Sequence, residues 1–209
     1  MTTSGRPREI SIPDFLTAVA SADGVHDAVS ASAVAGGIGA SLLLRVAAIP
    51  KTRSTSVDAS LIDVSTALSG VQEQLMEAIE TETAVKIFAA RNMPQTSERQ
   101  RTERQAAIQL ALRAAADVPL EIMRLCDSGL KLAETVARHS SRAASPDVQL
   151  AVALLHAAFS GARASFEAKL SSLTDTRFIT SVIDEIARLT DEASRAARAA
   201  ESHLHVPPA

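Results

Sequence analysis

Apolar residues recur at steps of three and four along most of this chain, which is the spacing of one face of an α-helix. The clearest seam, typical of a helical bundle, lies in residues 57–90 and contains Leu61, Val64, Leu68, Val71, Leu75 and Ile79. The same spacing predicts further helices over 11–21, 29–48, 97–116, 117–138, 147–170 and 175–201. No run alternates apolar and polar residues as a β-strand does. The pattern predicts an all-α protein of about six or seven helices around one core.

Prolines mark the ends of several predicted helices. Pro50 and Pro94 each follow directly on a helical run and are expected to end it. Pro119 instead lies inside a helical pattern, where its missing N–H and its ring both oppose a regular helix. We therefore expect Pro119 to kink the helix or to start a new one, with Asp117 as the N-cap.

The composition agrees with a single bundle. The 209 residues are 46% hydrophobic but only 2% aromatic, with no Trp and no Tyr, so Ala, Leu, Val and Ile must build the core. Side chains of this size bury little area each, so the helices must pack closely. We expect one domain over residues 9–202, with a disordered N-terminus over 1–8 and a disordered tail over 203–209.

Residues 28–49 are rich in Ala, Gly and Ser and are long enough to be mistaken for a membrane span. Arg45 lies inside this stretch, and Ala and Gly insert weakly into bilayers. Small residues four apart, such as Gly36 and Ala40, let another backbone approach closely. We therefore predict the central helix of a soluble bundle and no membrane partner. Because such a helix is buried on all sides, we also expect the core to continue across the subunit boundary of a homodimer.

The net charge argues against a nucleic-acid partner, and the N-terminal sequence argues against secretion. The net charge is −3 with acids and bases interspersed, which gives no basic surface for nucleic acid. The first residues, MTTSGRPREISIPDF, contain no apolar stretch of the kind a secretory signal needs. A cytoplasmic protein is therefore expected.

Motifs of common catalytic and cofactor sites are absent from the sequence. GGIG at 36–39 lies within a helical pattern and not after a strand, so it does not indicate a dinucleotide site. Cys126 is the only cysteine and is expected to be a small buried hydrophobe. His156 lies on an apolar helix face and is expected to be a core residue and not a ligand. The residues alone therefore predict no cofactor and no metal.

The order of the segments, however, resembles a known family. The most specific stretch is AAIQLALRAAADVPLEIMRLC at 106–126, followed by SASAVAGGIGASLLLRVA at 30–47. Over about residues 9–200 the chain resembles the formiminotetrahydrofolate cyclodeaminase / methenyltetrahydrofolate cyclohydrolase family. The resemblance implies an all-helical bundle that forms tight dimers, with a folate pocket at or near the dimer interface.

The polar positions depart from the pattern of this family more than the packing positions do. Where the family has a Pro-Gly-Gly-Gly-Ser loop that packs on the pterin ring, this chain has His-Asp-Ala-Val-Ser at 26–30. The basic loop of the family is reduced to Lys51 and Arg53. An aspartate of the family aligns with Glu80, and another aspartate is retained as Asp147. The resemblance therefore implies a conserved scaffold with an altered pocket rim.

Three residues are the candidate catalytic groups that the resemblance implies. Asp147 or Glu80 would act as general acid or base and as the carboxylate that orients a cationic one-carbon group. His26 would serve as acid or base in place of groups that this chain lacks.

Four further residues are the candidate substrate-binding groups. Lys51 and Arg53 would hold the glutamate tail of a folate by charge. Asp27 and Ser30 lie at the mouth of the small-residue helix, where free N–H groups meet polar ligand atoms. For Asp27 a purely structural role is also open, because aspartate is a preferred helix N-cap.

Three functions remain open from the sequence. The chain could be a folate enzyme that acts on methenyl- or formimino-tetrahydrofolate as a small-molecule substrate. The same scaffold could instead be a cyclase or hydrolase that acts on another small molecule in a specialised pathway. Loss of pocket residues with a retained core would equally fit a non-catalytic dimeric member of the family.

Overall fold

The computed structural model describes residues 10–21, 26–49, 55–79 and 83–204, with the backbone alone at 55–59 and 83–86. Within this part of the chain the regular structure is entirely helical, so the all-α prediction is confirmed. The helices are α1 (Ile12–Ala20), α2 (Ala28–Ala47), α3 (Thr55–Ile79), α4 (Thr83–Arg91), α5 (Glu98–His139), α6 (Ser145–Leu170) and α7 (Thr176–Ser202). A short 3-10 turn, Arg142–Ala144, precedes α6.

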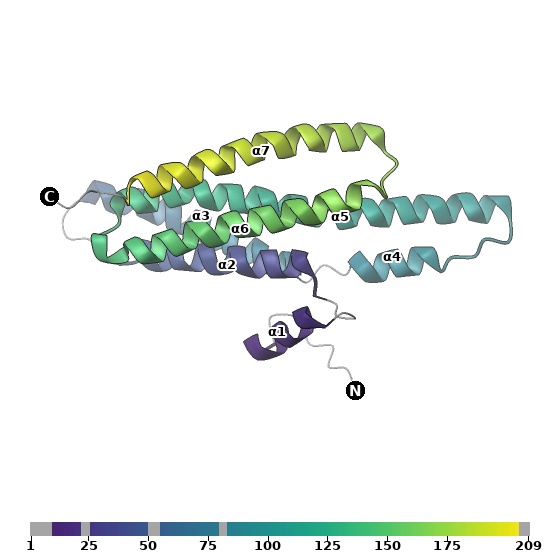
Figure 1. The fold of residues 1–209 in the computed structure, drawn as a ribbon, viewed down its shortest axis with the longest axis horizontal. Helices are drawn as coiled ribbons and strands as arrows, with labels where there is room; N and C mark the ends of the chain where they lie inside the picture. Colours follow the sequence, from purple (N-terminus) through teal and green to yellow (C-terminus); the bar gives the residue numbers. More distant parts are fainter. Residues whose placement is uncertain (1–9, 22–25, 50–54, 80–82, 205–209) are drawn as a thin grey trace.

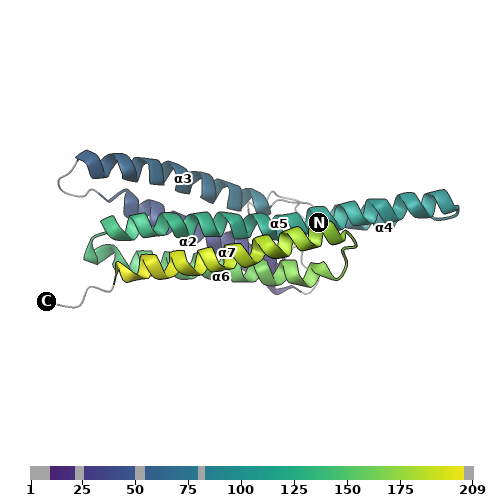
Figure 2. The same cartoon turned by 90° about the horizontal axis from the view of Figure 1, so that it is seen from above.

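Four of these helices form the central bundle. α2 packs against α3 and α6, and α5 packs against the same two helices and also touches α2 across the bundle (Figures 1 and 2). α7 lies along α5 and only lightly touches α6. α4 and the first part of α5 form a hairpin that extends beyond the bundle, and α1 lies apart below α2 (Figure 1). The α4–α5 hairpin and α1 therefore lie outside the four-helix bundle, and α7 flanks it.

The predicted seam of α3 faces the core. Leu68 and Leu75 are fully buried, and the other four members of the seam are at most 8% exposed. The single long run predicted over 57–90 is nevertheless divided into α3 and α4, since α3 ends at Ile79 and α4 begins at Thr83. The described part of the predicted tail consists of His203, the C-cap of α7, and Leu204, which packs against the core.

Glycines set the distance between α2 and its neighbours. A Cβ atom on Gly39 would lie 2.9 Å from the carbonyl oxygen of Ala151 and 2.9 Å from Cγ of Leu155, both on α6. One turn earlier, a Cβ atom on Gly36 would lie 3.1 Å from Leu75 and 3.2 Å from the sulfur of Cys126. The backbones approach this closely only because these positions carry no side chain.

α2 is also the helix that could be mistaken for a membrane span. Among the described helices it alone is long and apolar enough to cross a bilayer. Of its most apolar 18-residue stretch, 56% is buried inside the protein. Ala33, Ala40 and Leu43 have no exposed surface at all. This burial is that of a core helix, as the sequence predicts.

Pro119 is accommodated inside one continuous helix, which corrects part of the sequence-based expectation. α5 starts at a capping box, in which the Ser97 hydroxyl accepts from the N–H of Gln100 at 3.2 Å. It then runs through Pro119 to His139, so Asp117 is exposed within the helix and is not an N-cap. A mid-helix proline costs about 3 kcal/mol. Burial of the large apolar side chains that follow, such as Met123, stabilises by about 1.5–3 kcal/mol each and offsets this cost.

The α4–α5 hairpin is held by arginine side chains that reach main-chain carbonyls. Arg104 donates from Nε and Nη2 to the carbonyl oxygen of Arg91 at 3.0 and 2.8 Å. Arg101 donates from Nε to the carbonyl oxygen of Gln95 at 3.1 Å. These bonds satisfy carbonyls at the end of α4 and in the connecting turn, where no further helical N–H is available.

Ion pairs run along the contact between α5 and α7. Arg124 holds Glu185 in a two-bond contact at 2.7 and 2.9 Å. Seven residues further along both helices, Lys131 contacts Glu192 at 2.6 Å and Asp127, only 4% exposed, at 2.7 Å. Hydrogen bonds to Lys131 and then to Arg188 lower the pKa of Glu192 to about 2. The Arg124 contact likewise lowers the pKa of Glu185.

Replacement of Gly39 by alanine tests the close approach of α2 to α6. Because the new methyl group meets backbone and a packed leucine, we expect Gly39→Ala to lower the free energy of unfolding by about 1–3 kcal/mol. Gly70→Ala is the matched control, since its Cβ would meet only Gln74 at 3.9 Å. That substitution should raise the free energy of unfolding by about 0.5–1 kcal/mol. Denaturant unfolding measures both, and equal effects of the two substitutions would contradict the packing described here.

The ion pairs between α5 and α7 predict how stability depends on pH. The folded pKa of Glu192 lies below its ordinary value of 4.5, so its contribution is fully present above pH 4.5 and disappears as the pH falls toward 2. We expect Glu192→Gln to flatten the fall in unfolding free energy between these pH values. Denaturant titrations at several pH values measure this slope. A variant with the same slope as the native chain would show that the ion pairs do not stabilise the folded state.

Candidate functional site

The described candidate residues are divided between the two ends of α2. His26, Asp27 and Ser30 lie at its N-terminal end, and Asp147 lies at the other. Glu80, Lys51 and Arg53 lie outside the described residues, so their predicted roles stay predictions.

Asp27 is the N-cap of α2. Its Oδ1 accepts from the backbone N–H of Val29 at 2.9 Å and from that of Ser30 at 3.3 Å. The structural role left open for Asp27 in the sequence is therefore confirmed. Two of the N–H groups at the start of α2 are satisfied by the protein itself, and the exposed carboxylate adds a negative charge at this end.

His26 is the group at this end that is best suited to proton transfer. Its ring is partly buried and lies 5.2 Å from the ring of Phe15 on α1, with a 46° angle between the two planes. Ser30 is only 8% exposed and Ser32 donates to the carbonyl oxygen of Ala28 at 2.7 Å, so neither side chain competes for a ligand at the surface. This histidine directly precedes Asp27 in the sequence, and its ring contacts a ring of α1.

Asp147 lies in the first turn of α6, where a carboxylate is favoured by the helix dipole. It forms an ion pair with Nη1 of Arg45 at 3.3 Å. The Asp147 side chain is 30% exposed and that of Arg45 is 69% exposed, so the pair is open to solvent on one side. The sequence pointed to Arg45 only as a charge that opposes membrane insertion, and its contact with Asp147 could not be read from spacing.

The two ends of α2 are too far apart to form one site within a single chain. Asp27 and Arg45 are separated by 18 residues, which at about 1.5 Å per helical residue amounts to about 27 Å. Asp147 therefore does not lie near His26 in the chain itself. The two described candidate catalytic residues are thus separated within one chain.

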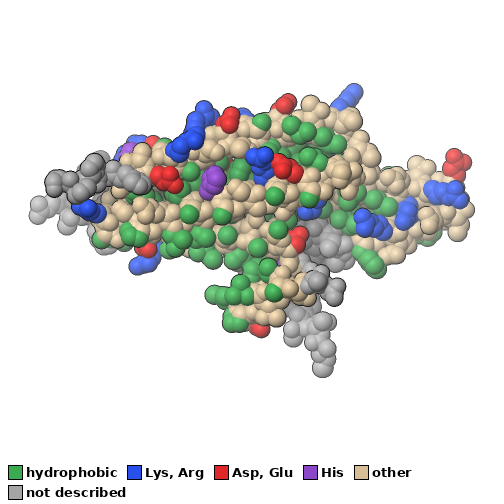
Figure 3. All heavy atoms as spheres, in the orientation of Figure 1, with side chains coloured by type: hydrophobic (Ala, Val, Ile, Leu, Met, Phe, Trp, Pro, Cys, Tyr) green, Lys and Arg blue, Asp and Glu red, His purple; other side chains and the backbone are tan. Residues whose placement is uncertain are grey.

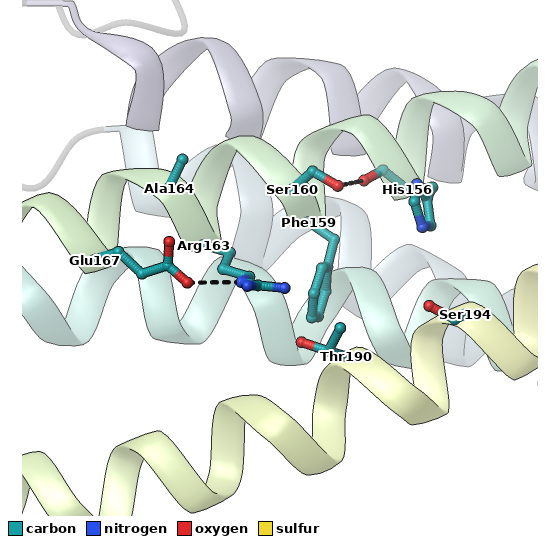
Figure 4. Close-up of a pocket in the computed structure, with 8 residues that line it drawn as sticks. All are labelled: His156, Phe159, Ser160, Arg163, Ala164, Glu167, Thr190 and Ser194. Carbon is teal, nitrogen blue, oxygen red and sulfur yellow. Dashed lines mark hydrogen bonds and ion pairs between the residues drawn. The ribbon is translucent and has the colours of Figure 1, made fainter.

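A groove lies between α6 and α7 on the described surface. It has a volume of about 350 Å³ and is lined by His156, Phe159, Ser160, Arg163, Ala164, Glu167, Thr190 and Ser194 (Figure 4). His156 points into this groove and is exposed, so the prediction that it is a core histidine is wrong. The helix turns this side chain toward α7, which contacts α6 only lightly.

The polar groups of this groove are largely satisfied by their own helices. Ser160 donates to the carbonyl oxygen of His156 at 2.9 Å, and Thr190 donates to that of Ile186 at 2.7 Å. Nε of Arg163 contacts Glu167 at 2.8 Å, so the charges of the groove neutralise each other (Figure 4). None of the candidate residues lines it. In the part of the chain that is described, no three His, Cys, Asp or Glu side chains cluster as metal ligands do.

Comparison with known proteins identifies the scaffold. The formiminotransferase-cyclodeaminase family model matches residues 11–188, which is most of the chain. The chain belongs to this family. The resemblance noted in the sequence is confirmed, and the match spans both ends of α2, the first turn of α6 and the first half of α7.

Members of this family with assigned names are similar over nearly the whole chain. A methenyltetrahydrofolate cyclohydrolase of Methylorubrum extorquens is 29% identical, and the match covers 88% of this chain and 90% of that protein. A formimidoyltransferase-cyclodeaminase of Gallus gallus is 23% identical over 87% of this chain, which corresponds to 34% of that longer protein. The crystal structure of a formiminotetrahydrofolate cyclodeaminase from Thermotoga maritima has the same fold, with a TM-score of 0.83, 19% identity and coverage of 94% of this chain and 96% of that one.

The cap at the start of α2 gives a direct test of the local geometry. We expect Asp27→Ala to lower the free energy of unfolding by about 0.5–2 kcal/mol, because two N–H groups lose their acceptor. Asp27→Ser keeps an acceptor and should cost only a few tenths of a kcal/mol. Denaturant unfolding followed by circular dichroism measures both. If serine destabilises as much as alanine, the carboxylate does more than cap the helix.

Proposed function

We propose that this chain is a methenyltetrahydrofolate cyclohydrolase, which opens the one-carbon bridge of 5,10-methenyltetrahydrofolate with water. The observation that carries the proposal is the match to the Methylorubrum extorquens enzyme, which accounts for nine-tenths of that protein's length (90%). The family match over residues 11–188 also includes α2 and the first turn of α6, which carry the described candidate residues. The substrate is thus a small molecule, and the composition favours a cytoplasmic, soluble enzyme.

The reaction sets clear chemical requirements. Water adds to the cationic methenyl carbon and gives up a proton to a base. The resulting carbinol loses its second proton as the carbonyl forms, the bond from carbon to N5 breaks, and N5 takes up a proton. The products are 10-formyltetrahydrofolate and one net proton. Such a site needs a base that works near neutral pH and negative charge near the cationic carbon.

The described residues offer both requirements. His26 is the candidate base, since it is an imidazole that is partly exposed at the start of α2 and directly precedes Asp27 in the sequence. Asp147 is the candidate carboxylate for the cationic carbon, and Arg45 keeps it oriented at 3.3 Å. Glu80, Lys51 and Arg53 keep the roles proposed from the sequence. We also propose that the protein works as a homodimer, because α2 presents an apolar side to solvent.

A cyclodeaminase activity is the second candidate. It is favoured by the similarity to the chicken formimidoyltransferase-cyclodeaminase over 87% of this chain. In that reaction N10 attacks the formimino carbon of 5-formiminotetrahydrofolate, the carbon–nitrogen bond to the imino group breaks, and ammonia leaves. The same base and carboxylate would serve this step. Ammonia release from the formimino substrate distinguishes the two activities.

Loss of the absorbance of methenyltetrahydrofolate tests the proposed activity. We expect the purified chain to accelerate this loss over buffer, and His26→Asn to lower kcat/KM by about 100-fold or more. His156→Asn is the matched control, because that histidine lies in the groove between α6 and α7 and away from the candidate site. It should leave the rate unchanged.

Two outcomes would contradict this proposal. A folded native chain that does not exceed the rate in buffer with either folate would indicate a non-catalytic family member or an enzyme for another small molecule. An equal loss of activity in the two histidine variants would show that the site does not lie at the start of α2.

A further inference from the structure

The groove between α6 and α7 contains polar groups that the protein leaves without partners. Nε of Arg163 is held by Glu167, but Nη1 and Nη2 of the same guanidinium have no hydrogen-bond partner among the described residues. The imidazole of His156 and the hydroxyl of Ser194 also have none in this part of the chain. In Figure 4 the guanidinium extends away from Glu167 toward the ring of Phe159, and the His156 and Ser194 side chains point into the same space. Hydrogen-bonding groups from two helices therefore converge on one hollow.

A second positive charge lies at the His156 end of this groove. Arg198 follows Ser194 by four residues, so the two side chains share one face of α7. Arg198 is exposed, and it forms no ion pair with any other described residue. Figure 3 shows Lys and Arg side chains along α7, above α6. Because Glu167 already balances the charge of Arg163, Arg198 gives this end of the groove a net positive charge.

The other end of the groove is mainly apolar. A second hollow of about 330 Å³ begins at Arg163 and Thr190 and is lined by the apolar side chains of Leu170, Ile183, Ile186 and Ala187. Ile183 is 48% exposed, so a molecule that covered it would remove apolar surface from water. Glu167 and Asp191 border the same hollow, so this end carries negative charge.

The two hollows share Arg163, Glu167 and Thr190, and they form one groove with unlike ends. Leu170 lies fourteen residues after His156 on α6, which corresponds to about 21 Å at 1.5 Å per residue. A molecule that fits this groove has an anionic head and an extended apolar body. The negative side chains at the apolar end oppose the reverse orientation of such a molecule.

The packing of α7 keeps this groove open. α7 lies along α5, where Arg124 contacts Glu185 at 2.7 Å, and it touches α6 only lightly. The side chains of α6 and α7 that face each other along the groove are therefore not closely packed. Phe159 is only 3% exposed, so its ring gives the polar end an apolar base.

The groove is separate from the candidate catalytic residues. Asp147 and His156 are nine residues apart on α6, which is two and a half helical turns, so their side chains lie on opposite faces of this helix. The residues that line the groove do not include Asp147, Arg45 or His26. A ligand in the groove would therefore occupy a second site.

We propose that the groove between α6 and α7 binds an amphipathic organic carboxylate, a molecule of the fatty-acid type. The carboxylate accepts hydrogen bonds from Nη1 and Nη2 of Arg163, a pair of donors that matches its two oxygens. His156 and Ser194 supply further hydrogen bonds, and Arg198 supplies charge. The apolar body extends from this head toward Ile183 and the end of α6. Such binding is independent of the proposed folate reaction.

Binding of this kind has a consequence for stability. The ligand would contact α6 and α7 at once and would bind only the folded chain, because the two helices must lie side by side to form the groove. A molecule that binds only the folded state raises the midpoint of thermal unfolding.

Isothermal titration calorimetry of the full chain with dodecanoate, kept below the concentration at which it forms micelles, tests the site. We expect saturable binding of one molecule per chain and a higher Tm. Acetate has the head alone, and dodecyltrimethylammonium has the same tail with a cationic head. Each should bind at least about 10-fold more weakly than dodecanoate. No saturable binding of dodecanoate, or equal binding of the cationic detergent, would overturn the proposal.

Substitutions locate the binding to the groove. Arg163→Gln should raise the Kd for dodecanoate by about 10-fold or more, because the head loses its charged donors. Arg195→Gln is the matched control, since Arg195 is also exposed on α7 but is turned by about 100° from Ser194. It should leave the Kd unchanged.

A third variant tests the apolar end without a change of charge. Ala187 is exposed and lines this end, so Ala187→Trp should fill the groove and weaken dodecanoate binding while the chain stays folded. Circular dichroism checks the fold of each variant. Equal loss of binding in Arg163→Gln and Arg195→Gln, or native binding in Ala187→Trp, would overturn the assignment of the ligand to this groove.

Discussion

The close approach of α2 to α6 is the constraint on which the rest of this structure depends. Gly39 lets the main chain of α2 lie against the carbonyl of Ala151, and Ser32 occupies the space that a side chain on Gly161 would need. The core contains few aromatic side chains to fill larger gaps, so contact between backbones supplies much of the packing. α2 and α6 are held in a fixed register, and this register places Arg45 beside Asp147.

The length of α2 fixes the distance between the candidate residues at its two ends. Its N-terminal end carries the capped turn with His26, and its C-terminal end reaches the first turn of α6. The two described candidates for catalysis, His26 and Asp147, therefore lie at the starts of two packed helices, α2 and α6.

Much of the fold follows from the sequence, because burial repeats with the helical period. The seam of α3 and the capped starts of α1 and α5 agree with local pattern and local hydrogen bonds. Pro119 does not, because tertiary burial outweighs a local penalty. His156 is exposed because α7 lies mainly against α5, and the pattern of α6 does not encode which helix α7 covers. The placement of Asp147 likewise depends on which helices become neighbours.

The proline within α5 has a mechanical consequence. Without an N–H at position 119, the carbonyl of Ala115 lacks its helical partner, and α5 is missing one hydrogen bond within its buried part. A helix bends at such a position more readily than elsewhere. The hairpin built from α4 and the first turns of α5 is stiff within itself, since Arg104 ties it to Arg91. A bend at Pro119 would move this hairpin relative to the bundle, and the contacts of Gln109 with Thr174 and of Arg113 with Asp175 oppose it.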